Sequence, residues 1–180
     1  MASSAPANQI ARAHRLSISR ANRLLAVLNI AMADTALTIW SAKRFYGEDA
    51  AAVTWRPITA ITQAATDDNP GTGPDVAWAP LVTTPSHPEY PAGHPSQNGA
   101  GATVLLSHFR RQQTFTLTTA AQPNRTYTSI AQARSDGDNA RIWGGMHYPS
   151  TVWISDAEGA AIAHYVNTKS MQLPRGKPLK

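Results

Sequence analysis

Hydrophobic residues recur at helical spacing along most of the chain. The strongest pattern covers residues 21–46, which are apolar almost all round and therefore predict a buried helix. Residues 95–110 predict a second buried helix, with Ser96 as its cap. Ser155 and Glu158 form a capping-box pattern that predicts the start of a further helix. Weaker helical patterns cover residues 9–20 and 130–147.

A segment rich in proline, glycine and aspartate interrupts this pattern over residues 66–91. A loop of this length is usually functional or disordered, and its aromatic and proline residues favour an ordered loop. Residues 114–119 alternate weakly and predict a short strand or an extended segment. The polar start, residues 1–8, and the basic tail, residues 172–180, are expected to be flexible. The pattern predicts a mainly α-helical single domain over residues 1–180, with the chemistry carried by loops.

Composition narrows the function classes. Hydrophobic residues make up 42% of the chain, which excludes disorder over most of its length. The absence of cysteine excludes a disulfide scaffold, a thiolate metal site and a cysteine nucleophile. The net charge is +5, yet the basic tail has no interleaved aromatic residues, so no nucleic-acid partner is expected. The longest apolar run, residues 24–33, is far shorter than a membrane span, so we expect a soluble protein with no membrane partner. Oligomeric state and compartment stay open.

Three short motifs contain the candidate chemistry. A lysine near the end of the strongest helix is followed by W-R-P-I-T-A-I. The second motif, P-E-Y-P-A-G-H, leads directly into a predicted helix, and the third is A-R-I-W-G-G-M-H. The residues that these motifs offer for chemistry are Lys43, Arg56, Gly93, His94, Arg141 and His147.

These residue types suit the binding of a tetrahedral oxyanion. Arg56 and Arg141 each offer a planar fork of donors that matches phosphate-like oxygens. Gly93 stands just ahead of a predicted helix, where its bare backbone N–H can approach an anion and the helix dipole favours negative charge. Of the two histidines, His94 and His147, one can serve as nucleophile or ligand and the other as acid–base.

In order and spacing, the motifs resemble those of the vanadium-dependent haloperoxidases, and of the type 2 phosphatidic acid phosphatase and bacterial acid phosphatase superfamily that contains them. That superfamily has Lys-x6-Arg-Pro, then Pro-Ser-Gly-His, then Ser-Arg-x5-His. The resemblance runs from about Ile10 to His164 and points to the soluble haloperoxidase branch. It implies a helical bundle of the haloperoxidase and acid phosphatase type. Because family members usually carry more helices before the motifs, it also implies a shortened or partial version.

The resemblance implies vanadate as the cofactor, and phosphate can occupy the same site. His147 would be the axial ligand of vanadate, or the phosphorylated nucleophile in a phosphatase. Arg56, the Gly93 amide and Arg141 would hold the equatorial oxygens.

The resemblance also implies the reaction. Hydrogen peroxide and halide would react to give hypohalous acid, which halogenates a small organic acceptor. Lys43 would polarise bound peroxide and His94 would be the acid–base partner. His87 lies seven residues before His94, where bromide-preferring relatives often carry histidine and chloride-oxidising relatives carry phenylalanine. The resemblance therefore favours bromide.

The sequence departs from the family pattern at three places. Lys43 lies 13 residues before Arg56, a wider spacing than in the family, which an insertion between them would explain. The motif serine is Ala92, so one hydroxyl donor is missing. Thr151 stands where an aspartate commonly follows the axial histidine by four residues, which leaves Asp156 as the candidate partner of that histidine.

Two other functions use the same residues. One is a soluble acid phosphatase with a phosphohistidine intermediate. The other is a catalytically weakened homologue that still binds an oxyanion, which the three departures favour.

Overall fold

A computed structural model describes residues 4–48, 54–109, 112–118 and 124–171. The fold is mainly helical, as the sequence predicts. In chain order its elements are α1 (Ala5–Ala13), α2 (Ile18–Glu48), α3 (Pro57–Thr62), a 3-10 turn η1 (Ala64–Thr66), α4 (Gly93–His108), β1 (Gln112–Leu117), β2 (Arg125–Ser129), α5 (Ile130–Trp143) and α6 (Pro149–Lys169).

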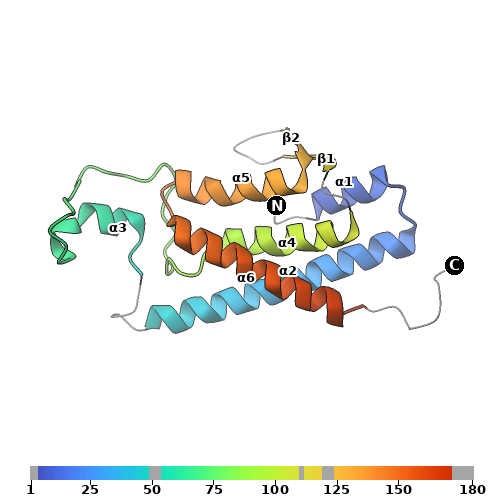
Figure 1. Ribbon diagram of the computed structural model, residues 1–180, viewed down its shortest axis with the longest axis horizontal. Helices are drawn as coiled ribbons and strands as arrows, with labels where there is room; N and C mark the ends of the chain where they lie inside the picture. The colour runs from blue at the N-terminus through green and yellow to red at the C-terminus, as the bar shows by residue number, and fades with distance from the viewer. Residues whose placement is uncertain (1–3, 49–53, 110–111, 119–123, 172–180) are drawn as a thin grey trace.

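Helix α4 is the central element of the bundle (Figure 1). It packs against α2, α5 and α6, and its small residues from Gly99 to Ala102 are all buried. Small side chains let several helices approach one helix closely, which explains why α4 can be surrounded. The apolar side chains that fill the core around it include Leu24, Val27, Leu28, Val104, Leu105, Ile130, Ala163 and Val166.

Two glycines allow α4 and α6 to cross with their backbones close together. A Cβ added at Gly159 would lie 1.8 Å from the carbonyl oxygen of Ser96, and one at Gly99 would lie 2.1 Å from that of Asp156. The close crossing brings the Ser155 hydroxyl to 2.8 Å from the backbone N–H of Ala92, which donates to it. The N-terminus of α4 is thereby fixed against α6.

The long loop, residues 66–91, docks on the turn between α5 and α6. Gly145 has a φ of +73°, and its α carbon faces Trp78 and Pro80, so a side chain there would meet both conformational strain and a clash. The N–H of Val82 donates to the carbonyl of Gly144 at 3.2 Å. This docking carries the following residues of the loop across the bundle toward the start of α4.

The structure corrects two predicted helix starts. Ser96 does not cap α4; it lies within the first turn, and its hydroxyl donates to the Ala92 carbonyl. The capping-box pattern at Ser155 is also misleading, because α6 begins at Pro149 and Ser155 is buried inside it. Proline is favoured in the first turn of a helix, where its missing N–H costs nothing, and this signal outweighs the capping box.

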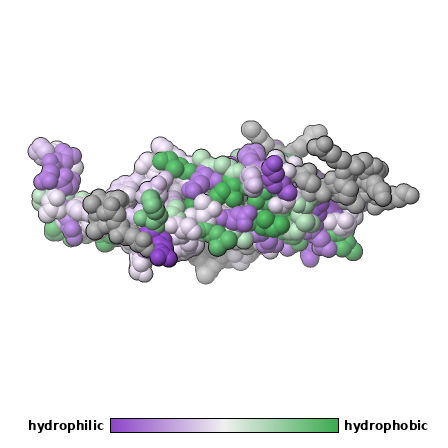
Figure 2. Space-filling model, turned by 90° about the horizontal axis from the view of Figure 1, so that it is seen from below, coloured by the Kyte–Doolittle hydropathy of each residue, from purple (hydrophilic) through white to green (hydrophobic). Residues whose placement is uncertain are grey.

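Helix α2 is less enclosed than its apolar sequence predicts. Leu37 and Trp40 are 69% and 56% exposed, whereas Ala31, Ile39 and Lys43 are buried. By length and composition alone this helix could cross a membrane, a test that core helices of soluble proteins also pass. In the structure one side of it packs against α4 and α6, and Figure 2 shows hydrophobic residues scattered among hydrophilic ones over the face seen from below.

Some shorter predictions differ from the structure. Residues 5–8, expected to be flexible, belong to α1, and Pro6 and Ala7 are buried. The weak strand pattern is β1, which pairs antiparallel with β2, a strand that the sequence did not reveal. The expected insertion between α2 and α3 and the basic tail, residues 172–180, fall largely or wholly outside the described residues.

Replacing Gly159 with alanine is expected to lower the free energy of unfolding by about 1–3 kcal/mol, because the new methyl group would overlap a backbone carbonyl of α4. Urea unfolding followed by circular dichroism measures the loss. Gly73→Ala is the matched control, since a Cβ there meets nothing within 4 Å, and it should change stability by less than about 0.5 kcal/mol. Equal stability of the two variants would contradict the close helix crossing.

Candidate active site

The three motifs meet at one cavity of about 220 Å³. The polar side of its wall consists of Lys43, His87, Gly93, His94, Gln97, Arg141 and His147. The apolar side consists of Ala36, Ile39, Trp40 and Pro85. Arg56 joins this group through contacts with two of the histidines. The structure thus brings together the seven residues that the sequence proposed for binding and catalysis, namely Lys43, Arg56, His87, Gly93, His94, Arg141 and His147.

Arg56 connects the three motif segments through main-chain carbonyls. Its Nη1 donates to the carbonyl of Met146 at 2.8 Å, and its Nη2 donates to the carbonyls of His87 at 2.8 Å and Pro88 at 3.2 Å. Nη1 also lies 3.2 Å from Nε2 of His147. A guanidinium can only donate, so this ring nitrogen carries a lone pair.

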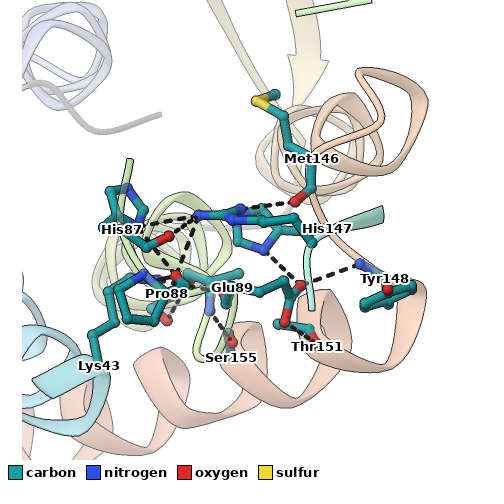
Figure 3. Close-up of polar contacts among 12 residues, drawn as sticks. Lys43, His87, Pro88, Glu89, Met146, His147, Tyr148, Thr151 and Ser155 are labelled. Atoms are coloured by element: carbon teal, nitrogen blue, oxygen red, sulfur yellow. Dashed lines mark hydrogen bonds and ion pairs between the residues drawn. The ribbon is translucent and has the colours of Figure 1, made fainter. Parts of the chain in front are cut away.

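His147 is buried and its other ring nitrogen faces a carboxylate. Nδ1 lies 2.8 Å from Oε1 of Glu89, and neither side chain is more than 2% exposed (Figure 3). Since Nε2 accepts from Arg56, the ring proton is on Nδ1 and donates to Glu89. Burial lowers the pKa of His147, although the hydrogen bond that the ring donates to Glu89 opposes this, so the neutral form of the ring is favoured.

Glu89 replaces the partner that the sequence suggested for His147. Asp156 was the candidate, but it forms an ion pair with Arg134 instead. Glu89 was visible in the sequence as the single acid of the P-E-Y-P-A-G-H motif. It was missed because helical spacing directs attention to position 151, one turn after His147, and not to a loop far away in the chain.

Lys43 reaches the site despite its wide spacing from Arg56. Its side chain is buried, and Nζ donates to the carbonyl of Pro88 at 2.7 Å and lies 3.4 Å from that of Glu89. Burial and the positive charge of Arg56 lower the pKa of Lys43 to about 8. This lysine can therefore give up a proton near neutral pH.

Gly93 and His94 form the start of α4 at the cavity. A Cβ at Gly93 would meet nothing within 4 Å, so its backbone faces open space that a bound group could fill. His94 lies at the mouth with part of its ring exposed. Burial of the remainder and the charge of Arg141 lower the pKa of His94 to about 4.

Two arginine donors indicate what the cavity can hold. Among the described residues, the buried Nε atoms of Arg56 and Arg141 have no hydrogen-bond partner. Buried donors without partners are costly, and a guanidinium is a strong binder of carboxylate, phosphate and related oxyanions. The arginine donors, the open backbone of Gly93 and Nε2 of His147, which an anion would share with Arg56, suit a tetrahedral oxyanion such as vanadate or phosphate.

The two remaining sequence features have different positions. Nδ1 of His87 lies 3.1 Å from Nη2 of Arg56, and its ring meets Trp40 edge-on at 5.1 Å between centroids. His87 therefore lines the cavity beside the arginine. Ala92, the residue in place of the motif serine, is fully buried and is not part of the wall. In the part of the chain that the structure describes, no group of three histidine or carboxylate side chains could hold a metal ion.

Comparison with known proteins agrees with this geometry. Residues 23–176 match the family model described as the "VCPO second helical-bundle domain", in which VCPO denotes vanadium chloroperoxidase. The chain belongs to the vanadium haloperoxidase family. A comparison with curated proteins gives no match.

Solved haloperoxidase structures share the fold. The first bacterial vanadium-dependent iodoperoxidase superimposes with a TM-score of 0.76 and 26% identity over 91% of this chain and 37% of that chain. A holo-type bacterial vanadium-dependent chloroperoxidase gives a TM-score of 0.68 and 19% identity, over 93% of this chain and 39% of that chain. The apo-type bacterial vanadium-dependent chloroperoxidase gives a TM-score of 0.67 and 18% identity, over 93% of this chain and 41% of that chain. This chain therefore spans about two fifths of those haloperoxidases, as a partial haloperoxidase-type bundle.

Arg141 and Arg56 are expected to behave differently when each is replaced by methionine. Arg141→Met should leave the free energy of unfolding within about 0.5 kcal/mol of the wild type in low salt, because it removes a desolvated charge from a positive cluster. Arg56→Met should lower it by at least about 1.5 kcal/mol, because three carbonyls lose a charged donor. Sulfate should raise the melting temperature of the wild type and not that of Arg141→Met. Equal responses to sulfate would contradict an oxyanion site at Arg141.

Proposed function

We propose that this chain is a vanadate-dependent haloperoxidase domain that oxidises halide with hydrogen peroxide to hypohalous acid. The observation that carries the proposal is a buried His147 whose Nε2 faces the Arg56 guanidinium, at a cavity that Arg141 also lines, with the Nε–H donors of both arginines lacking partners among the described residues. Family membership and the likeness to an iodoperoxidase support it.

The family resemblance assigns the cofactor-binding roles, and the donors at the cavity suit them. Nε2 of His147 would bond vanadate, while Arg56, Arg141 and the Gly93 amide would hold its oxygens. When bound, vanadate would activate hydrogen peroxide as a Lewis acid, and vanadium would keep its oxidation state. Lys43, Arg56 and Arg141 surround the cavity with positive charge, which compensates an anion and holds it out of water.

Two residues would move protons. His94 is neutral above about pH 5, because its pKa is lowered to about 4, so its ring has a nitrogen open to a proton from incoming hydrogen peroxide, which it accepts as a weaker base than an ordinary histidine. Lys43 uses its ammonium to bond two loop carbonyls and still has a third N–H for a substrate oxygen. Its lowered pKa also makes it a better proton donor than an ordinary lysine.

The cavity wall also suits the proposed substrates. Ala36, Ile39, Trp40 and Pro85 form an apolar side that suits a large, weakly hydrated halide or a small organic acceptor. His87 lies between this side and Arg56, and we assign it the selection of halide, with bromide preferred over chloride. Because a related structure is an iodoperoxidase, iodide belongs in the same comparison.

A soluble acid phosphatase is the second candidate, since the two histidines favour it. His147 would attack phosphorus through Nε2, and His94, protonated only at acidic pH because its pKa is lowered to about 4, would give its proton to the leaving oxygen there. Vanadate mimics the transition state of phosphoryl transfer, so one site can support either reaction. A weakened homologue would bind the anion and catalyse neither.

The activity test uses the protein with orthovanadate, hydrogen peroxide and bromide. Bromination of monochlorodimedone is expected, and His147→Ala should reduce it to background because the axial bond is lost. His164→Ala, an exposed histidine on α6, is the matched control and should keep wild-type turnover. Hydrolysis of p-nitrophenyl phosphate without bromination would establish the phosphatase, and vanadate binding with neither activity would establish the weakened homologue. Bromination that survives in His147→Ala would refute the assignment.

Halide selection is tested by comparing initial rates with iodide, bromide and chloride. The wild type is expected to oxidise iodide and bromide and to oxidise chloride poorly. His87→Phe should change the ratio of bromide to chloride oxidation rates at least about tenfold. The reason is that a polar ring in contact with Arg56 is replaced by an apolar ring. Ser86→Ala, an exposed neighbour, is the control. An unchanged ratio in His87→Phe would remove His87 from halide selection.

A further inference from the structure

A buried carboxylate lies directly behind the proposed axial histidine. Glu89 is fully buried, and all three donors around its carboxylate come from the start of α6 and the turn before it (Figure 3). His147 Nδ1 lies 2.8 Å from Oε1, the backbone N–H of Tyr148 donates to the same oxygen at 3.3 Å, and the Thr151 hydroxyl donates to Oε2 at 3.0 Å. With three donors around two oxygens, Glu89 acts purely as an acceptor.

We propose that Glu89 is a positioning residue that fixes the tautomer of His147, and that Thr151 orients Glu89 for this task. The carboxylate that the family places one helical turn after its axial histidine is supplied here from a loop. The effect of Glu89 on catalysis rests on the proposed function, whereas its effect on the tautomer of His147 does not.

Helix geometry explains the exchange. His147 precedes the N-cap Tyr148 of α6 and Thr151 lies in its first turn, and both side chains reach the Glu89 carboxylate, so they face the same point. An aspartate at position 151 could accept from the ring N–H directly. Thr151 is buried, and its hydroxyl donates a hydrogen bond to Glu89 instead. Glu89 and Thr151 together therefore replace the aspartate of the family pattern. The hydroxyl has no other described partner that would explain its burial at this point.

Neutralising the nearby cations does not explain the position of the Glu89 side chain. Lys43 bonds the carbonyl of Pro88 and approaches that of Glu89, and Arg56 bonds the carbonyls of His87 and Pro88. Within the part of the chain that the structure describes, the hydrogen bonds of the carboxylate go only to the segment that carries His147. Its charge does act on both cations over distance, but its geometry serves the imidazole.

The test measures the tautomer of His147 by ¹⁵N NMR of its imidazole, without added vanadate. In the wild type the proton is expected on Nδ1 and the lone pair on Nε2. Glu89→Ala should shift the ring toward protonation at Nε2, because the acceptor for Nδ1–H is lost. The double variant Glu89→Ala with Thr151→Asp should restore the wild-type tautomer. Glu158→Ala, a half-buried acid on α6, is the control and should leave it unchanged.

Activity gives the second readout. With orthovanadate, hydrogen peroxide and bromide, Glu89→Ala should lose about 10–100-fold in kcat, as is usual for partners of a metal-bound histidine, and the double variant should regain most of it. If the wild type shows no turnover, the proposed function fails while the tautomer experiment still decides the role of Glu89.

Glu89→Gln covers the case in which Glu89→Ala does not fold. Glutamine has nearly the same volume as glutamate, but its amide can either accept from or donate to Nδ1 of His147. The fraction of His147 rings protonated at Nδ1 should therefore fall below that of the wild type. An unchanged tautomer in every folded Glu89 variant would overturn the proposal. So would a folded double variant in which the tautomer shift of Glu89→Ala persists.

Discussion

The bonds from one guanidinium to main-chain carbonyls connect the parts of this site. Arg56 precedes α3, yet it donates to Met146 in the turn before α6 and to His87 and Pro88 in the long loop. Charged donors bonded to buried carbonyls are among the stronger hydrogen bonds of a protein. Lys43 adds a bond to the same Pro88 carbonyl from α2. The loop is therefore held in place by the side chains that the family resemblance assigns to anion binding.

Concentrating these cations around one cavity has an electrostatic cost. Burial and the charge of Arg56 lower the pKa values of Lys43 and Arg141, and the Glu89 carboxylate partly offsets this lowering at Lys43. The unpartnered Nε–H donors of Arg56 and Arg141 remain. A doubly or triply charged oxyanion would relieve the repulsion and satisfy both donors at once, which a neutral ligand would not do.

Local patterns predicted the long elements and the motif residues, because these depend on residues close in sequence. The periodicity of α2 and α4 and the ordered loop are examples. The features that the sequence did not predict depend on contacts between segments distant along the chain. Glu89 binds His147 across 58 positions, and Ser155 looks like a cap but serves as the acceptor for Ala92 in another helix. The exposure of Leu37 and Trp40 was likewise hidden, because apolar periodicity does not reveal which faces find a neighbour.

The central claim is that an oxyanion binds between Arg56 and Arg141 at Nε2 of His147. An anomalous X-ray difference map from crystals soaked in orthovanadate tests it most directly, because vanadium is the only strong anomalous scatterer added. We expect a single peak at bonding distance from Nε2 of His147, displaced by excess phosphate and absent in His147→Ala. A peak elsewhere on the molecule, or none at saturating vanadate, would contradict the account.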